Sequence, residues 1–425
     1  MKFARLAIPC LVALLIGSAP ALAGNKYKGW TVVQVEDGPN VLDDLKTAFA
    51  NAQPETIIQL PKATIQVDSE LEISSDYVLV KGRNPKRTIL DFSSQVSGGQ
   101  GILVSGDYVT LENFTILNTP SDGVRSQRVN GDTVEELVGV TYRKMKVEWT
   151  SPDDFTHGAY GFYPVNSRDI LIEKTEVIGA NDAGIYVGQS NNIIVTKNKV
   201  HGNVAGIEIE NSNDADVFKN RCWDNTGAIL VFNHPYLSQT GSHTRVFKNK
   251  LIENNHANFG SGTVGLVPPG TGVIVLANDS VEIFKNKIFG HVTAGIEMAS
   301  HDLVEVAPPP FDPYPETVWI HDNKYKDNGA NPTGALGAVI DFHLDGGRDI
   351  VWDRDIDEEK LVDGVLPEEF RICIDEKKFT YGSANMTELA LDSEAVPVVV
   401  NEPTEHLCEH PSLSEITIPD PPPAL

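Results

Sequence analysis

The sequence predicts an all-β fold, a right-handed parallel β-helix whose coils are about 22 residues long. The first observation is an apolar segment that recurs at this spacing, beginning at Ala183, Ala205 and Gly227. The second is that each unit holds short alternating strands and no helical pattern. The third is a column of asparagines that starts with the same period: Asn198, Asn220, Asn249, Asn286 and Asn323.

The repeated segments are expected to stack in register from coil to coil. Side chains alternate along a strand, so Ile185, Ile207 and Ile229 should face the core and the residues between them should face outward. The asparagines are expected to form an internal ladder of side-chain amides, each bonded to the next coil. Leucine-rich repeats have a similar period, but their spaced leucines and helical half are missing from this sequence.

The domain organisation follows from where the repeat begins and ends. We expect the β-helix domain to span 24–345, opening with a cap helix over about 40–52 that has Asn40 at its N-cap. Beyond this domain the period is lost, and 346–425 is predicted to be an irregular tail over the last coil. Inserts rich in proline and glycine lengthen the later coils: 234–242, 258–271 and 305–317.

The first 23 residues have the pattern of a signal peptide. Lys2 and Arg5 precede a short apolar stretch, and Ala21-Leu22-Ala23 supplies the small residues of a cleavage site. The apolar stretch is too short to span a bilayer. The sequence therefore predicts an exported protein, periplasmic or secreted, with no membrane span.

Three cysteines follow the predicted signal peptide. Cys373 and Cys408 both lie in the predicted C-terminal tail, and an oxidising compartment would allow them to form a disulfide. Cys222 falls at an inward-facing position of a repeat, so it is predicted to be a buried small hydrophobic residue.

The chain is strongly acidic, with 34 Lys and Arg against 59 Asp and Glu. Its formal net charge is −25, and loss of Lys2 and Arg5 with the signal peptide would make it −27. This excess disfavours nucleic acid and anionic membranes as partners. It also weighs against a polyanionic glycan, unless a divalent cation bridges the two.

Two stretches carry a resemblance to a known family. Residues 158–190 and 204–232 are similar to a family of exported proteins built from parallel β-helix (PbH1) repeats. The resemblance implies the same fold and compartment. It also implies an exported neighbour that looks like a c-type cytochrome as a candidate partner, and it assigns no activity.

A shorter segment resembles an enzyme motif only in part. Tyr160-Gly161-Phe162-Tyr163-Pro164-Val165 is similar to the Tyr-Gly-Phe-Asp-Pro-His motif of mannuronan C5-epimerases. Tyr160 matches, but Tyr163 and Val165 stand where that motif has its aspartate and histidine. The expected groups for moving a proton at a sugar C5 are therefore incomplete.

The outward-facing residues of the repeated strands form the main candidate site. One column contains Tyr163, Tyr186 and Glu208, and a neighbouring column contains Glu210. Aromatic rings beside carboxylates on an elongated face suit a sugar chain. The alternative is that the inserts fold over this face, which the apolar members of the same columns favour: Leu230, Phe232, Ile274 and Leu276.

Roles can be assigned within this face as hypotheses. Glu208, Glu210 and Tyr160 are the candidate catalytic residues, since glycoside cleavage needs two carboxyl groups. Tyr163 and Tyr186 would bind the substrate, with His157 and Asp182 at the rim.

Metal binding is a weaker expectation at two places. Asp153, Asp154 and Asp182 could supply oxygen ligands to calcium, although no calcium-loop spacing is present. His406 and His410 flank Cys408, but that cysteine is already expected in the disulfide.

The first hypothesis is an exported protein that binds a carbohydrate on its solenoid face and, if it is an enzyme, acts as a polysaccharide lyase, hydrolase or epimerase. The second is a non-catalytic scaffold whose apolar outward column docks another exported protein. An open face at Tyr163 and Tyr186 would favour the first hypothesis, and an uncovered patch at Leu230 and Ile274 the second.

Overall fold

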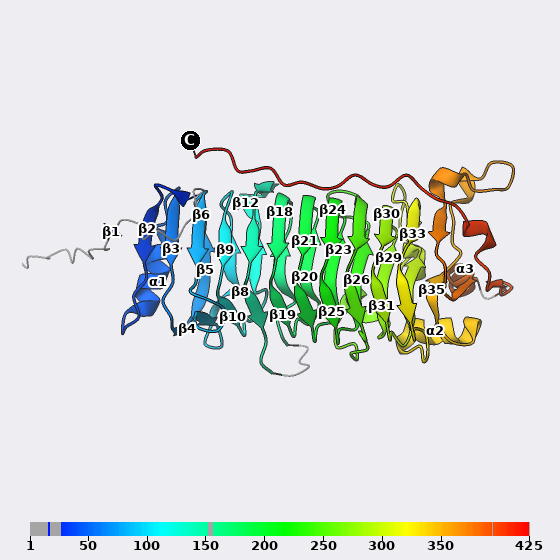
Figure 1. Ribbon diagram of the computed structural model, residues 1–425, viewed down its shortest axis with the longest axis horizontal. Helices are drawn as coiled ribbons and strands as arrows, with labels where there is room; N and C mark the ends of the chain where they lie inside the picture. Colours follow the sequence, from blue (N-terminus) through cyan, green and yellow to red (C-terminus); the bar gives the residue numbers. More distant parts are fainter. Residues whose placement is uncertain (1–15, 18–26, 152–155, 393, 425) are drawn as a thin grey trace, which may run out of the picture.

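The computed structural model describes residues 16–17, 27–151, 156–392 and 394–424. The chain winds into a long solenoid in which each regular coil gives one strand to each of three parallel sheets (Figure 1). The predicted fold class, an all-β parallel β-helix, is confirmed.

The three sheets run the length of the solenoid. Sheet A contains β1 (Ile16–Gly17), β2 (Thr31–Gln34), β3 (Thr56–Gln59), β6 (Val78–Lys81), β9 (Thr110–Glu112), β14 (Leu137–Val138), β15 (Thr141–Arg143), β18 (Ser167–Glu173), β21 (Asn191–Thr196), β24 (Asn213–Phe218), β27 (Ser242–Phe247), β30 (Asp279–Phe284), β33 (Val318–His321) and β36 (Ile372–Asp375). Sheet B contains β4 (Thr64–Gln66), β7 (Ile89–Asp91), β10 (Thr115–Leu117), β16 (Lys146–Glu148), β19 (Glu176–Ile178), β22 (Lys199–His201), β25 (Arg221–Trp223), β28 (Lys250–Ile252), β31 (Lys287–Phe289) and β34 (Lys324–Lys326). Sheet C contains β5 (Ser69–Ile73), β8 (Ser97–Val104), β11 (Val124–Ser126), β17 (Tyr160–Pro164), β20 (Ala183–Gly188), β23 (Ala205–Glu210), β26 (Gly227–Phe232), β29 (Thr271–Leu276), β32 (Ala294–Ala299), β35 (Arg348–Trp352), β37 (Tyr381–Ala384) and β38 (Val399–Val400). A separate hairpin is formed by β12 (Arg128–Asn130) and β13 (Thr133–Glu135).

The register between coils is the one that the period predicts. Ile185 pairs with Ile207, and Ile207 with Ile229, so the inward side chains stack in one column. All three are fully buried in a continuous core that extends along the solenoid. Cys222 is buried in the same core as a free cysteine, as predicted.

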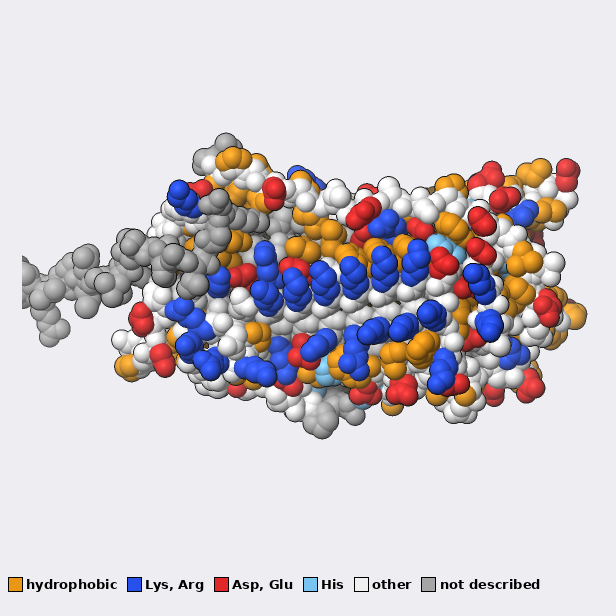
Figure 2. All heavy atoms as spheres, in the orientation of Figure 1, with side chains coloured by type: hydrophobic (Ala, Val, Ile, Leu, Met, Phe, Trp, Pro, Cys, Tyr) orange, Lys and Arg blue, Asp and Glu red, His pale blue; other side chains and the backbone are white. Residues whose placement is uncertain are grey.

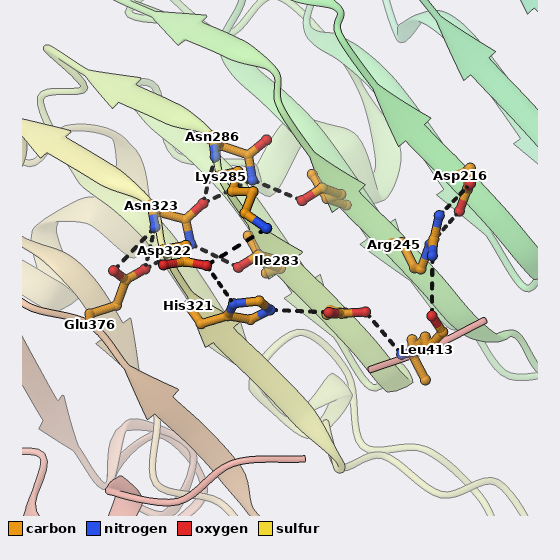
Figure 3. A network of polar contacts seen from close by, with 12 residues as sticks. Asp216, Arg245, Ile283, Lys285, Asn286, His321, Asp322, Asn323, Glu376 and Leu413 are labelled. Carbon is orange, nitrogen blue, oxygen red and sulfur yellow. Dashed lines mark hydrogen bonds and ion pairs between the residues drawn. The ribbon is translucent and has the colours of Figure 1, made fainter. Parts of the chain in front are cut away.

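The predicted asparagine ladder forms at the corner between sheets A and B. The amide of Asn220 donates to Asn249 Oδ1 at 3.2 Å, and that of Asn249 to Asn286 Oδ1 at 3.1 Å. Each asparagine oxygen also accepts the backbone N–H of the asparagine one coil earlier. The ladder ends where Asn323 donates to Glu376, as Figure 3 shows.

A second ladder at the corner between sheets B and C was not predicted. The amide of Asn203 donates to Asn225 Oδ1 at 2.9 Å, and that of Asn225 to Asn254 Oδ1 at 2.8 Å. His291 and Asn328 continue the column. The third corner, between sheets C and A, has a shorter column of buried serines in which Ser190 Oγ accepts from Ser167 N and Ser212 Oγ accepts from Ser190 N. Buried polar side chains therefore line all three corners over part of the solenoid.

A short amphipathic helix, α1 (Val41–Ala50), closes the N-terminal end. Leu45 and Phe49 are buried against the first coils, and Asn40 is at the predicted N-cap position, although its side chain makes no capping hydrogen bond. The predicted signal peptide lies outside the described residues except for β1, which pairs antiparallel with β2.

The C-terminal region differs from its prediction, because the solenoid continues past residue 345. β35 pairs parallel with β32, and β36 pairs parallel with β33. The 22-residue period is lost because long connections separate these strands: α2 (Gly334–Leu344) precedes β35, and the 3-10 helices η4 (Glu358–Lys360) and η5 (Glu368–Phe370) lie between β35 and β36. Farther on, α3 (Met386–Leu391) lies between β37 and β38, and the 3-10 helix η6 (Thr404–His406) follows β38.

The final residues form a tail that runs back along the outside of sheet A (Figure 1). The predicted disulfide between Cys373 and Cys408 is present and ties its start to β36. Farther on, Leu413 O accepts from Arg245 and Leu413 N donates to Glu282 (Figure 3). The tail therefore covers several coils of sheet A, not only the last one as predicted.

The asparagine ladder gives the first prediction. Asn249→Ala would leave the backbone N–H of Asn220 and the carbonyl of Val217 without their buried partners. We expect the free energy of unfolding to fall by about 2–4 kcal/mol, measured by urea denaturation. Asn331→Ala, the same change at an exposed position, is the matched control and should have almost no effect. Equal stability of the two variants would contradict a structural role for the ladder.

Candidate functional site

The outward columns of sheet C have the predicted register. Tyr186 pairs with Glu208, which in turn pairs with Leu230, and Glu210 pairs with Phe232. The candidate tyrosines and glutamates therefore come together on neighbouring coils, as the sequence predicted.

The alternative, that the inserts fold over this face, is confirmed for the central and C-terminal coils. The insert 258–271, which contains the 3-10 helix η2 (Gly262–Leu266), folds over this face and buries Val264 and Val267 against it. The amide of Asn258 holds the insert closed by donating to the carbonyls of both valines. The apolar column is buried beneath it and joined by Leu303 and Val304: Leu230, Phe232, Ile274 and Leu276. This covering removes the uncovered patch on which the docking-scaffold hypothesis depended.

Three tyrosines form a compact aromatic group at the edge of the covered region. The ring of Tyr160 lies 4.5 Å from that of Tyr163 and 4.6 Å from that of Tyr186, measured between centroids. Tyr186 is buried, whereas Tyr160 and Tyr163 are partly exposed. Such close packing of rings on one strand face fixes their orientation.

Carboxyl groups pack directly against these rings. Tyr186 Oη donates to Glu210 Oε1 at 2.5 Å, and Tyr160 Oη donates to Asp182 Oδ2 at 3.2 Å. Glu208 and Glu210 lie two residues apart on β23, beside these rings. We call this set the tyrosine–carboxyl cluster: Tyr160, Tyr163, Tyr186, Asp182, Glu208 and Glu210.

Burial controls the protonation of the tyrosine–carboxyl cluster. Desolvation raises the pKa of Asp182 to about 7 and holds that of Glu208 well above its usual range, with mutual repulsion adding to both. The pKa of Glu210 is also raised by burial. The pKa of His234 is lowered to about 4 by burial and by His301, so its contact with Glu210 at 3.7 Å is not an ion pair at neutral pH.

These positions change the roles predicted for two residues. Glu208 is 4% exposed and Tyr186 5% exposed, so neither side chain lies on a surface that a sugar chain could reach. Glu208 Oε2 has no hydrogen-bond partner among the described residues. Of the predicted catalytic pair, Glu208 is thus enclosed, whereas Glu210 is partly exposed, as are Asp182, Tyr160 and Tyr163.

The predicted rim residues have different environments. His157 is buried, packs beside Trp149 and donates from Nδ1 to the carbonyl of Gly179 at 2.8 Å, so it does not lie at a rim. Asp182 is part of the tyrosine–carboxyl cluster. Asp153 and Asp154, the other proposed calcium ligands, lie outside the described residues.

Other possible ligand groups are occupied by protein partners. His406 Nε2 lies 2.9 Å from Tyr381 Oη, and His410 Nε2 donates to the carbonyl of Arg371. Cys408 is in the disulfide, so these three residues do not form a metal site together. Within the described residues, one acidic cluster has ligand spacing, and the ammonium of Lys360 binds its members: Asp312, Glu316 and Asp357.

An open groove lies next to the tyrosines, over the N-terminal coils of sheet C. We call it the sheet C groove; its volume is about 620 Å3, and the β12–β13 hairpin forms one wall. Arg125 closes its end, with its guanidinium 4.9 Å from the ring centroid of Tyr163 and donating to Gln127 Oε1. The sequence did not indicate this groove because its residues come from irregular coils: Glu72, Ser74, Gln100, Leu103, Ser105, Arg125, Gln127, Arg128, Val129, Asn130 and Glu135.

The enclosed acids give the second prediction, a pH dependence of stability. A carboxyl whose folded-state pKa is raised stabilises the fold below its unfolded-state value near 4.3, and this contribution is lost as pH rises through the folded-state pKa. We expect Glu208→Gln to raise the free energy of unfolding by about 1–3 kcal/mol at pH 7.5 and by much less at pH 4.5. Denaturant titrations at both pH values would measure it. The exposed control Glu359→Gln should show no such difference, and a loss of stability in Glu208→Gln at pH 7.5 would contradict the enclosed-acid interpretation.

Solved structures similar to this one have low sequence identity. The A-module of the mannuronan C-5 epimerase AlgE6 of Azotobacter vinelandii is 14% identical, with 68% of this chain and 84% of that chain covered and a TM-score of 0.49. The endo-xylogalacturonan hydrolase of Aspergillus tubingensis is 11% identical, with 81% and 99% covered and a TM-score of 0.42. A mannuronic acid specific family 6 polysaccharide lyase from human gut microbiota is 13% identical, with 76% and 79% covered and a TM-score of 0.44. No curated protein matches the chain in sequence.

A family model gives a more direct assignment. Residues 100–308 match the model described as a right handed beta helix region. The matched residues run from β8 through part of the insert that follows β32. No helix of the described residues is long and apolar enough to cross a membrane. The three parallel sheets and this match show that the chain has the right-handed parallel β-helix fold.

Proposed function

We propose that the protein is an exported carbohydrate-binding β-helix and that the sheet C groove is its binding site. The observation that carries the proposal is an open groove lined by hydrogen-bonding side chains and ending at Arg125 over the ring of Tyr163. Sugar sites combine polar groups that fix hydroxyls with an aromatic or apolar surface. The disulfide between Cys373 and Cys408 supports an oxidising compartment.

Arg125 is the residue best placed to recognise a ligand. Within the described residues it forms no ion pair, and its Nε and one terminal nitrogen both donate to a single acceptor, Gln127 Oε1. The guanidinium has five N–H donors, so further donors remain for hydroxyl or carboxylate oxygens. Arg128, by contrast, is engaged with Asp76 and Asp107.

The tyrosine–carboxyl cluster supports this site from behind. Tyr163 packs against Tyr160 and Tyr186, which are in turn hydrogen-bonded to Asp182 and Glu210. This packing fixes the ring on which Arg125 rests. Binding is the function that this geometry supports, since Glu208, one of the two carboxyls predicted to exchange a proton with a substrate, is buried.

The third prediction tests the groove directly. The protein is screened by thermal shift against neutral and uronic oligosaccharides, with and without calcium; a ligand at 100 times its Kd adds about 2.7 kcal/mol of stability. Arg125→Gln should weaken binding of the best ligand by roughly 10- to 100-fold, the loss expected for a charged hydrogen bond.

Arg87→Gln, at an exposed arginine that has no ion pair among the described residues, is the matched control and should bind as the parent does. Calorimetric titration with each variant measures the difference. No thermal shift with any oligosaccharide, or equal binding by Arg125→Gln and the parent, would refute the groove as a carbohydrate site.

A further inference from the structure

We propose a second binding surface, on a different face, for an extended acidic polysaccharide. Figure 2 shows two parallel rows of Lys and Arg side chains along the long axis of the solenoid. They flank the corner between sheets A and B, on either side of the buried asparagine ladder. We call them the cation rows.

Each row is a column of one repeat position. The first row directly follows the strands of sheet A and contains Lys144, Lys174, Lys197, Lys219, Lys248 and Lys285. The second begins the strands of sheet B, with Glu176 the one acidic residue in its register: Lys146, Lys199, Arg221, Lys250, Lys287 and Lys324. Parallel strands lie about 4.8 Å apart, so each row presents a cation at about that interval.

Most of these cations have no anionic partner. Lys146 pairs with Glu148, Lys174 with Glu173, and Lys285 with Asp322 at 3.8 Å. The other nine form no ion pair with any described residue. All of the cations except the half-buried Lys146 are exposed. Like charges held at close intervals repel one another, so a row of this kind favours binding of an anion that spans it.

The left-handed backbone conformation at the first row supports a role for the lysine side chains in binding an anion. All six lysines have left-handed backbone angles, with φ from 51° at Lys144 to 59° at Lys197. Glycine or asparagine adopts this conformation at lower cost than lysine does. Six consecutive coils nevertheless carry an exposed lysine there.

Neighbouring aromatic rings hold several of these lysines in place. The ammonium groups of Lys219, Lys248 and Lys285 lie 5.4, 5.6 and 5.3 Å from the ring centroids of Phe218, Phe247 and Phe284. Cation–π attraction of this kind orients an ammonium group without neutralising it. The first row ends at Asp322, which occupies the same position in the next coil. Asp322 forms an ion pair with Lys285, the last lysine of the row (Figure 3).

The surface is concave where the rows begin. A groove of about 840 Å3 is lined by lysines of both rows, by neutral residues such as Thr115 and Leu117, and by two glutamates, Glu148 and Glu176. A linear chain fits such a groove along the solenoid axis, whereas a flat membrane surface contacts only its edges.

An apolar row beside the second cation row indicates the chemistry of the chain. It consists of half-buried residues in register along sheet B: Ile178, His201, Trp223, Ile252 and Phe289. Sugar rings carry apolar C–H faces beside their charged groups, and an inorganic polyphosphate does not. His201 and Trp223 stack on each other, with their ring centroids 4.1 Å apart.

The spacing also favours an acidic polysaccharide over a nucleic acid. An extended chain of pyranose rings advances by about one ring per coil, which would place a carboxylate opposite each pair of cations. Phosphates on a strand of duplex DNA follow a helical path around the duplex, so they do not stay opposite a straight row of cations about 4.8 Å apart.

The fourth prediction tests the cation rows. Calorimetric titration with a polyuronate oligosaccharide is compared for the full chain and for the triple variant Lys197→Gly, Lys219→Gly and Lys248→Gly. We expect the triple variant to bind roughly 10- to 100-fold more weakly, as loss of three surface ion pairs would produce, and with a smaller dependence on salt. Its melting temperature should be equal or higher, since glycine suits the left-handed backbone.

The matched control replaces three exposed lysines elsewhere: Lys62→Gly, Lys377→Gly and Lys378→Gly. It should bind the polyuronate as the parent does. Equal binding by the triple variant and the parent would overturn the proposal. Tighter binding of single-stranded DNA, polyphosphate or anionic lipid vesicles than of the polyuronate would also overturn it, because the occupant would then belong to another class.

The two proposed binding surfaces can be tested separately. Arg125→Gln changes the sheet C groove and leaves the cation rows intact, whereas the triple variant does the reverse. Polyuronate binding that is lost in Arg125→Gln and retained in the triple variant would overturn the cation-row proposal while supporting the groove.

Discussion

The constraint on which this molecule depends is the fixed spacing between coils. Parallel backbone pairing sets neighbouring strands about 4.8 Å apart, so any residue type repeated at one position becomes a straight row along the solenoid. The spacing suits a column of buried asparagines. The side-chain amide of Asn220 donates to Asn249 Oδ1 in the next coil, and the same oxygen accepts the backbone N–H of Asn220. The same spacing aligns Tyr186 with Glu208 and aligns the exposed lysines one residue away from the asparagines.

The inserts and the C-terminal tail cover some of these rows and leave others exposed to solvent. The 258–271 insert covers the outward face of sheet C around Leu230, and the tail at Leu413 covers part of sheet A. The N-terminal coils of sheet C and the corner between sheets A and B are open, and both proposed surfaces lie there. Enclosure also explains the protonated acids, since a column that would otherwise be solvated becomes a low-dielectric interior once the insert closes over it.

The period alone predicted much of the fold, because a repeat reports on stacking directly. The asparagine ladder, the register of Tyr186 with Glu208, the cap helix and the disulfide of Cys373 all followed from local pattern or composition. Burial of Glu208 could not be predicted, since it depends on where a distant insert folds. The coils after residue 345 were missed because α2 interrupts the spacing. The cation rows had a sequence signal, the repeated Lys-Asn-Lys or Lys-Asn-Arg triplets, but the strongly negative net charge argued against an anionic partner.

Net charge is a poor guide to recognition in a solenoid because it sums over faces that a ligand meets one at a time. The formal value of −25 counts every carboxyl as ionised. Burial raises the pKa of Asp182, Glu297 and Asp353 to about 7, so these groups are partly protonated at neutral pH. The field of the exposed lysines extends over about 8–10 Å at physiological salt, which spans neighbouring coils but not the width of the molecule. An anionic chain at the corner between sheets A and B therefore meets a local field set by the cation rows, and the acids buried elsewhere contribute little to it.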